Sequence, residues 1–148
     1  RQVCQGYLDA SLDAEAFDED GWFRTGDLGV IDAQGFVSIT GRLKDIIIRK
    51  GENISAKEIE DLLFAHPSVA DAAVIGLPDD KSGERACAVI VCKPDLMITF
   101  DDMVSFLKSA QLSVHKIPEQ LEIVSALPRN PSGKVLKKDL RATYGGAK

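Results

Sequence analysis

Short runs of apolar residues, each bounded by glycine, proline or charged residues, predict small elements along the whole chain. A short helix is expected around residues 12–17. Two extended runs follow, at residues 28–31 and 36–39, and the turn-forming sequence AQG at 33–35 separates them. We interpret these runs as a β-hairpin. Because a lone hairpin is marginally stable in water, we expect it to belong to a larger structure.

The pattern after the hairpin predicts a strand at residues 46–49, a turn at 51–52 and then a helix. Ser55 and Glu58 have the spacing of a capping box, in which each side chain bonds the backbone of the other residue. The helix carries an apolar stripe and ends at Pro67, which cannot continue it. The stripe consists of Ile59, Leu62 and Leu63.

The rest of the chain predicts three more strands and two more helices. Apolar runs at 69–76 and 84–92 indicate two strands joined by a polar turn, and another strand is expected near 121–124. Thr99 is placed to cap a helix of regular apolar spacing, and a last helix can begin within 135–140. The order β, α, β, β, α, β, α predicts a small α+β domain with a central mixed or antiparallel sheet and flanking helices.

Composition narrows the class of protein. The 148 residues are 45% hydrophobic and 28% charged, which is typical of a folded globular protein. The formal net charge of -5 argues against nucleic-acid binding. No apolar run approaches the ~20 residues of a membrane span and no secretory signal is present, so we expect a cytoplasmic protein with reduced thiols. The first residue is Arg rather than Met, so we expect a piece of a longer protein.

The cysteines and histidines predict no metal site. Cys87 and Cys92 lie an odd number of positions apart in one apolar run, which places them on opposite faces of a strand. His66 and His115 are far apart, without a carboxylate or cysteine at ligand spacing. We therefore expect structural thiols and no metal ligands.

Three stretches combine glycine with isolated charges and are the candidates for chemistry. They are TGDLG at 25–29, GRLKD at 41–45 and NPSGK at 130–134. None is a Walker loop, because Pro128 stands where that motif needs a glycine. A GxGxxG motif is absent, and neither histidine has the context of a Ser-His-Asp base.

Together and in this order, the three stretches resemble the C-terminal part of the adenylate-forming superfamily, most closely acyl-CoA synthetases. The resemblance is carried by GWFRTGDLG, GRLKDIIIRKGENISAKEIE, HPSVADAAVIGLPD and PRNPSGKVLKKDL, which extend over most of the chain from Gly21 to Leu140. It implies a two-step ligase. A fatty or other organic acid attacks the α-phosphate of ATP to give acyl-adenylate and pyrophosphate, and the thiol of coenzyme A (CoA) then displaces AMP.

The resemblance also implies how the chain is divided. Residues 1–43 are expected to be a tail and the last hairpin of a large N-terminal AMP-binding domain, with a hinge at about residue 44 and a mobile C-terminal domain at 44–148. The large domain would be this chain's partner and would hold the acid pocket, most of the nucleotide site and the Mg²⁺ that accompanies ATP. We therefore expect residues 1–148 alone to be inactive. The identity of the acid is not encoded in them.

Three residues acquire nucleotide or hinge roles from the resemblance. Asp27 matches the carboxylate that accepts hydrogen bonds from the ribose hydroxyls, and the alternative is an aspartate that bonds its own turn. Arg42 matches an arginine that reaches the ribose or the phosphates, and the alternative is a solvated charge. Lys44 occupies the hinge position, where the backbone angles change as the small domain swings between two poses.

Other residues acquire catalytic or CoA-binding roles. Lys134 matches the lysine whose ammonium offsets the charge that develops between carboxylate and α-phosphate; taken alone, it would be a solvated surface charge. Gly51 matches the glycine beside which the pantetheine arm of CoA passes, and it can equally be a hairpin glycine with positive φ. Arg49 and Lys50 are candidates to hold the 3′-phosphate of CoA, or else they are solvated.

Two other functions stay open. An adenylation domain can pass its acyl group to the phosphopantetheine of a carrier protein instead of to CoA, although no carrier domain follows the last motif in this sequence. The isolated chain can also be a non-catalytic interaction module. The nature of the acyl acceptor distinguishes the first of these functions from a CoA ligase.

Overall fold

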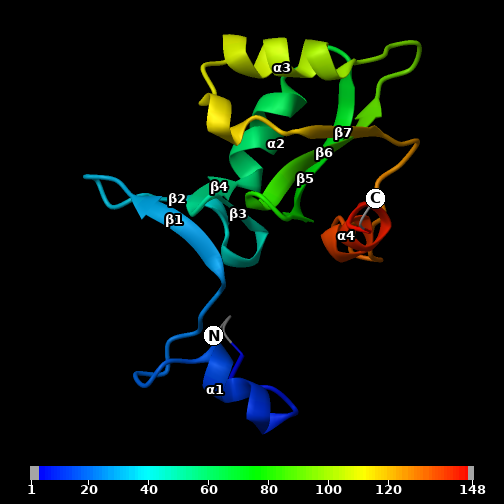
Figure 1. Ribbon diagram of the computed structural model, residues 1–148. Helices are drawn as coiled ribbons and strands as arrows, with labels where there is room; N and C mark the ends of the chain where they lie inside the picture. Colours follow the sequence, from blue (N-terminus) through cyan, green and yellow to red (C-terminus); the bar gives the residue numbers. More distant parts are fainter. Residues whose placement is uncertain (1–3, 147–148) are drawn as a thin grey trace.

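A computed structural model describes residues 4–146, and its N-terminal elements project away from the rest of the chain (Figure 1). The 3-10 helix η1 (Ala10–Leu12) and the short helix α1 (Asp13–Ala16) precede two antiparallel strands, β1 (Asp27–Ile31) and β2 (Val37–Arg42). The predicted short helix and hairpin are confirmed. Many apolar side chains of the hairpin are exposed, as expected of a hairpin without its own core. They include Val30, Ile31, Phe36, Val37 and Ile39.

The remaining elements form a lobe, defined here as residues 46–144, around a five-stranded sheet. Its strands are β3 (Ile46–Arg49), β4 (Glu52–Ser55), β5 (Val69–Asp79), β6 (Gly83–Cys92) and β7 (Gln120–Ile123). They lie in the order β4-β3-β6-β5, with β7 paired to β6. The β6–β7 pair is parallel and the other pairs are antiparallel, so the predicted mixed sheet and α+β class are confirmed.

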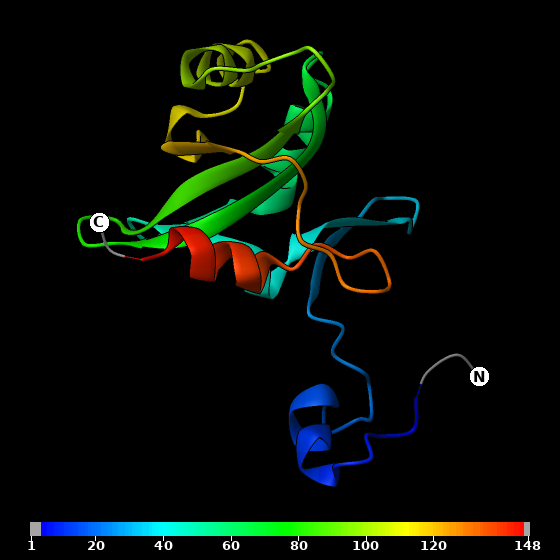
Figure 2. The ribbon, with the colours of Figure 1, turned by 90° about the vertical axis from the view of Figure 1, so that its right-hand side faces the viewer.

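Helices cover both faces of this sheet (Figures 1 and 2). Helices α2 (Ala56–Phe64) and α3 (Phe100–Ser109) pack on one face, and α4 (Lys137–Tyr144) packs on the other. Alternate residues of β5 point to opposite faces: Val74 is buried toward α2 and α3, and Ile75 is buried toward α4. Because both faces of β5 and β6 are buried, their sequences are continuously apolar instead of alternating.

Both predicted N-caps are present, but only one belongs to a complete capping box. The Thr99 hydroxyl accepts from the Asp102 backbone (3.2 Å), and the Asp102 carboxylate accepts from the Thr99 backbone (3.1 Å). The Ser55 hydroxyl accepts from the Glu58 backbone (3.4 Å), but the Glu58 carboxylate binds Lys116 Nζ (2.8 Å) instead of returning to the cap. The predicted Glu58 half of that box is therefore wrong, because an ion pair with a distant lysine replaces the local bond.

The turn after β3 lies one residue earlier than predicted. Lys50 and Gly51 both have positive φ, 51° and 80°, which is the pattern of a two-residue hairpin turn. Glu52, which was predicted to be in the turn, begins the unpredicted strand β4. Ile54 is the one fully buried side chain of β4, so the sequence of this strand has too little apolar alternation to predict it.

One other predicted boundary also differs. The turn predicted at residues 77–83 is shorter, because Leu77 is fully buried against α4 and β5 continues to Asp79. The last helix begins at Lys137, within the predicted range of 135–140, and Val135 before it pairs with Arg129 across a short bridge. No helix in the described part of the chain is long and apolar enough to cross a membrane.

The two cysteines of β6 lie on opposite faces, as predicted. Cys87 is fully buried in the cluster under α4, whereas Cys92 packs against the cluster under α2 and α3. Burial, together with the nearby Glu122 carboxylate, raises the pKa of the Cys87 thiol to about 12. The thiol therefore stays protonated at neutral pH.

Cys87 should resist alkylation in the native protein, because the thiolate is the reactive form and it is scarce at about pH 8. Cys4, which is exposed, serves as the control within the same chain. After brief iodoacetamide treatment, mass spectrometry of the peptides should find Cys4 modified and Cys87 unmodified until urea unfolds the protein. Equal labelling rates at the two positions in the native state would contradict the burial of Cys87.

Candidate functional site

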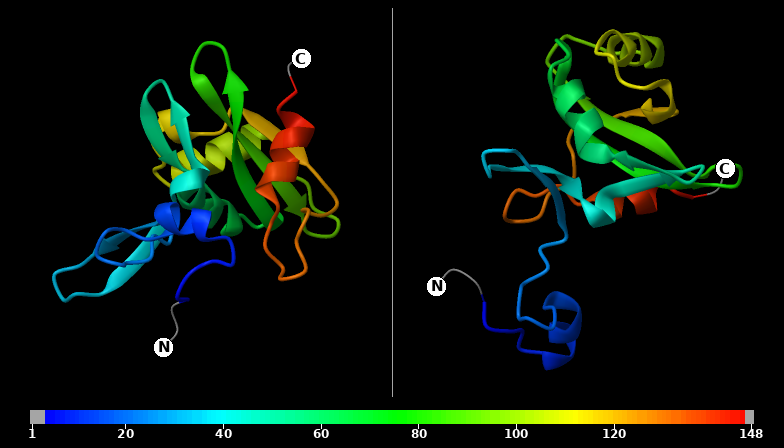
Figure 3. Two further views of the ribbon diagram at one scale, coloured as in Figure 1. Left: turned by 90° about the horizontal axis from the view of Figure 1, so that it is seen from below. Right: turned by 90° about the vertical axis from the view of Figure 1, so that its left-hand side faces the viewer.

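A hollow of about 990 Å³ opens between the hairpin and the lobe. Residues of the hairpin, of α2, of β5 and of the loop that precedes α4 line it. The two ribbon views of Figure 3 show how the hairpin and that loop are placed. Four residues predicted from three separate motifs line this one hollow. They are Asp27, Arg42, Lys44 and Lys134.

Asp27 and Arg42 form an ion pair at the base of the hairpin. The register of β1 and β2 places the two residues opposite each other, and Arg42 Nε lies 2.7 Å from Asp27 Oδ1. The backbone N–H of Asp27 donates to the Thr25 hydroxyl (3.0 Å). Within residues 4–146, no hydrogen bond engages Asp27 Oδ2 or the two terminal nitrogens of Arg42. One carboxylate oxygen and the end of the guanidinium fork can therefore meet a ligand.

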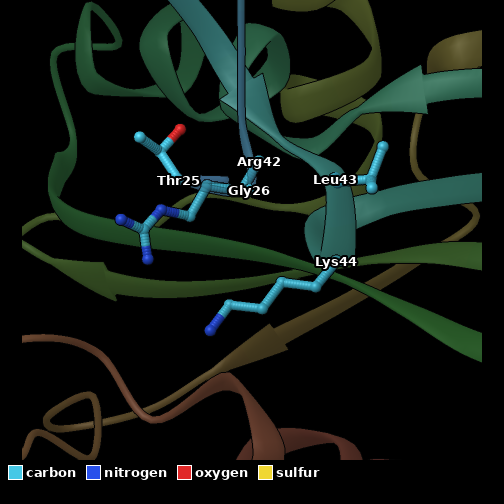
Figure 4. A pocket seen from close by; sticks show the side chains of 5 residues that line it. All are labelled: Thr25, Gly26, Arg42, Leu43 and Lys44. Atoms are coloured by element: carbon cyan, nitrogen blue, oxygen red, sulfur yellow. The ribbon is translucent and has the colours of Figure 1, made fainter. Parts of the chain in front are cut away.

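The connector between hairpin and lobe forms a second, smaller hollow of about 500 Å³ with residues 25–26. In Figure 4 the side chains of Arg42 and Lys44 extend to one side, and Leu43 points away from them. The backbone N–H of Leu43 donates to the carbonyl of Gly26 (2.8 Å), which ties this residue to the hairpin. Two cations are thus presented together at the edge of the main hollow.

Asp45, two positions after Leu43, is bound to the lobe. Its carboxylate accepts from Arg141 (3.3 Å) and lies 3.7 Å from Lys137 Nζ, both on α4. Lys137 Nζ also binds Glu60 on α2 (2.7 Å). Lys44 therefore lies between one residue bound to the hairpin and one bound to the lobe. Sequence reasoning missed this network, because its members are up to 96 positions apart and no motif links them.

The loop that carries Lys134 is held in one shape by its own hydrogen bonds. Asn130 Oδ1 accepts from the Lys134 backbone and the Ser132 hydroxyl, both at 2.8 Å. Gly133 has a φ of 83°, in the left-handed region that favours glycine. Lys134 is exposed, and its ammonium has no carboxylate within 4.0 Å in the described structure. Its charge is therefore available to a ligand in the hollow.

The residues predicted to bind CoA lie on the β3–β4 turn and do not line the hollow. A Cβ at Gly51 would meet no heavy atom within 4 Å, so the space beside it is open. The Lys50 backbone donates to the Ser82 carbonyl (2.7 Å), which holds the turn against the β5–β6 turn. Arg49 differs from the expectation, because its guanidinium donates to the His115 carbonyl (2.5 Å) and pairs with Glu119 (2.6 Å).

Residues 4–146 contain no group of three or more His, Cys, Asp or Glu side chains that could hold a metal ion. The carboxylates around the hollow are instead paired with cations: Asp27 with Arg42, and Asp45 with Lys137. This charge pattern suits an anion with several oxygens near Arg42, Lys44 and Lys134.

Comparison with known proteins gives consistent matches. The model of the AMP-binding enzyme C-terminal domain family matches residues 58–134, more than half of the chain. The medium-chain fatty-acid–CoA ligase of Escherichia coli K12 is 44% identical over 141 residues, covering 94% of this chain and 25% of that relative. The fatty acid–[acyl-carrier-protein] ligase ScoC of Streptomyces coeruleorubidus is 43% identical over 127 residues, covering 86% of this chain and 24% of that relative. This chain thus spans about a quarter of these relatives.

Two solved structures of one relative match to different degrees. ATP-bound MatB from Rhodopseudomonas palustris gives a TM-score of 0.88 at 41% identity, covering 97% of this chain and 29% of that chain. Apo MatB from the same organism gives 0.73 at the same identity and coverage. At equal identity and coverage, the structure described here is therefore more similar to the ATP-bound structure than to the apo structure.

Proposed function

Since this chain belongs to the AMP-binding enzyme family and includes its C-terminal domain, we propose that its parent protein is an ATP-dependent acyl-CoA ligase. In the first half-reaction, a carboxylate oxygen attacks the α-phosphorus of ATP; the bond to pyrophosphate breaks and acyl-adenylate forms. In the second, the CoA thiol loses its proton to solvent and the thiolate attacks the acyl carbon; the bond between that carbon and the phosphate oxygen breaks, and AMP leaves. Residues 1–43 end the large domain, and residues 44–148 form the mobile domain. We expect residues 1–148 alone to be inactive.

The observation that carries this proposal is the shared hollow, which Asp27 and Arg42 of the hairpin line together with Lys134 of the lobe. In our proposal the free oxygen of Asp27 accepts from the ribose hydroxyls. The terminal nitrogens of Arg42 reach the ribose or phosphate oxygens. The Mg²⁺ that accompanies ATP would neutralise phosphate charge, and residues outside this chain would hold it.

Lys134 serves the first half-reaction. Attack of one anion on another builds negative charge between the carboxylate and the α-phosphate, and a fixed ammonium at that position stabilises it as it develops. At ~4 Å and an effective dielectric constant of ~20, such a pairing is worth ~4 kcal/mol before desolvation. The absence of a carboxylate partner for Lys134 within residues 4–146 supports this role, because a paired ammonium would be neutralised already.

Lys44 is the hinge in this proposal. The bonds of Leu43 to the hairpin and of Asp45 to α4 leave residue 44 between two anchored neighbours. The Ser55 hydroxyl also donates to the Thr40 carbonyl (3.0 Å), a bond between lobe and hairpin that a swing would break. The two TM-scores for MatB support the existence of two arrangements in the family.

The second half-reaction uses the β3–β4 turn after the lobe has swung. The open space beside Gly51 suits the passage of the pantetheine arm, and Lys50 is exposed beside it as a partner for the 3′-phosphate. The guanidinium of Arg49 is occupied within the lobe, so we assign Arg49 to the support of this turn and no longer to CoA.

Transfer to a carrier protein is the second candidate for this step. The match to ScoC, whose name includes an acyl-carrier-protein acceptor, supports carrier-protein transfer as the alternative. The parent's thioester formation with CoA and with a phosphopantetheinylated carrier protein, measured side by side, decides between the two acceptors.

Replacing Lys134 with alanine in the full-length parent should reduce pyrophosphate release from ATP and a fatty acid by at least about 100-fold, because the developing charge loses its counter-ion. Thioester formation from supplied acyl-adenylate should stay within about twofold. Lys108→Ala removes another exposed lysine, on α3, and is the matched control. Equal loss of both half-reactions in the Lys134 variant would refute the assigned role.

Replacing Gly51 should produce the reverse pattern. Alanine and phenylalanine at this position both bear the strain of positive φ, but only phenylalanine fills the open space. Gly51→Phe should slow thioester formation from supplied acyl-adenylate at least about tenfold relative to Gly51→Ala, with pyrophosphate release unchanged. If the two variants transfer the acyl group at the same rate, CoA does not pass beside this residue.

A further inference from the structure

Arg129 connects the Lys134 loop to the central sheet. One terminal nitrogen of its guanidinium donates to the Gly133 carbonyl (2.5 Å), and the other pairs with Asp71 on β5. Gly133 directly precedes Lys134 in the chain, so this bond holds the peptide from which the lysine projects. Within residues 4–146, the Asp71–Arg129 pair is the hydrogen-bonded link between residues 128–136 and the sheet.

The Asp71 end of this link is itself fixed. Asp71 follows a register shift at the start of β5, between Val69 and Asp71, and its Oδ1 accepts from the Ala72 backbone (3.0 Å). That bond orients the carboxylate and leaves Oδ2 for Arg129. The planar guanidinium of Arg129 has donors on two terminal nitrogens, so it can bind the Asp71 carboxylate and the Gly133 carbonyl at the same time. The ammonium of a lysine is a single point charge and could not do so with the same geometry.

We infer that Asp71 and Arg129 are positioning residues for adenylation: they set the place of the Lys134 backbone relative to the hollow. This inference depends on the proposed role of Lys134. The pair is partly exposed, with side-chain exposures of 24% and 43%, so it contributes little to folding stability. Its effect is geometric, because a displacement of about 1 Å in a reacting group can reduce a rate by up to about 100-fold.

The test uses Arg129→Gln and Asp71→Asn in the full-length parent, which give two independent ways to break the same link. Each should lower kcat for pyrophosphate release about 10- to 100-fold, with KM for ATP changed less than about twofold. Thioester formation from supplied acyl-adenylate should be unchanged. The double variant should be no slower than the worse single variant. In a Lys134→Ala background, Arg129→Gln should cause no further loss.

Lys116→Gln is the matched control. It breaks a partly exposed ion pair with Glu58 that does not line the hollow, and it should leave both half-reactions unchanged. Melting temperatures of all variants should agree within a few degrees, and Asp71→Asn decides the matter if Arg129→Gln does not fold.

Several results would overturn the inference. A raised KM for ATP at normal kcat would mean that Arg129 binds the nucleotide itself. Further loss in the Lys134→Ala background, or an equal fall in both half-reactions, would mean that the pair acts other than through Lys134. Normal pyrophosphate release by Lys134→Ala alone would instead remove the proposed function of that lysine, which is a separate failure.

Discussion

The attachment of the Asp45 carboxylate to α4 is the constraint on which the rest of the structure depends. Lys137, 16% exposed, pairs with both Asp45 and Glu60. Removal of any one of these three side chains would leave a partly buried charge without its full set of partners, which is destabilising. This set of three side chains fixes the chain to the lobe at Asp45, and the bond of Leu43 to Gly26 fixes it to the hairpin. A hinge needs such firm neighbours, because a change of φ and ψ at one residue moves a whole lobe only if the flanking residues stay in place.

Lys134 and Gly51, the two lobe residues to which the proposal assigns roles, lie in different turns, and each turn is held by hydrogen bonds. Lys134 follows a glycine of positive φ in a loop closed by Asn130, and Gly51 lies in a two-residue turn bound to Ser82. Neither turn is buried, so rigidity comes from hydrogen bonds instead of packing. In the proposed mechanism, both residues are thus held in place before substrate binds, and rotation about the hinge would determine which one faces it.

Much of this arrangement could be predicted from sequence, because its signals are local. The continuous apolar runs of β5 and β6, the cap at Thr99 and the glycine-plus-charge motifs each lie within one short segment. Contacts between distant segments could not be predicted. Glu58 was predicted to bond its own helix cap but pairs with Lys116, and the pairing of Arg49, a candidate CoA ligand or solvated charge, with Glu119 was not anticipated. Local spacing contains no information about such partners.

The central claim, that one residue lets the lobe alternate between two poses, is tested most directly by a distance across the hinge. Spin labels at Gln34 on the hairpin and Lys108 on α3, both exposed, allow pulsed electron paramagnetic resonance on the full-length parent. The account predicts one distance distribution with a non-hydrolysable ATP analogue and a clearly different one with an acyl-adenylate mimic and CoA. The same distribution under both conditions would contradict it.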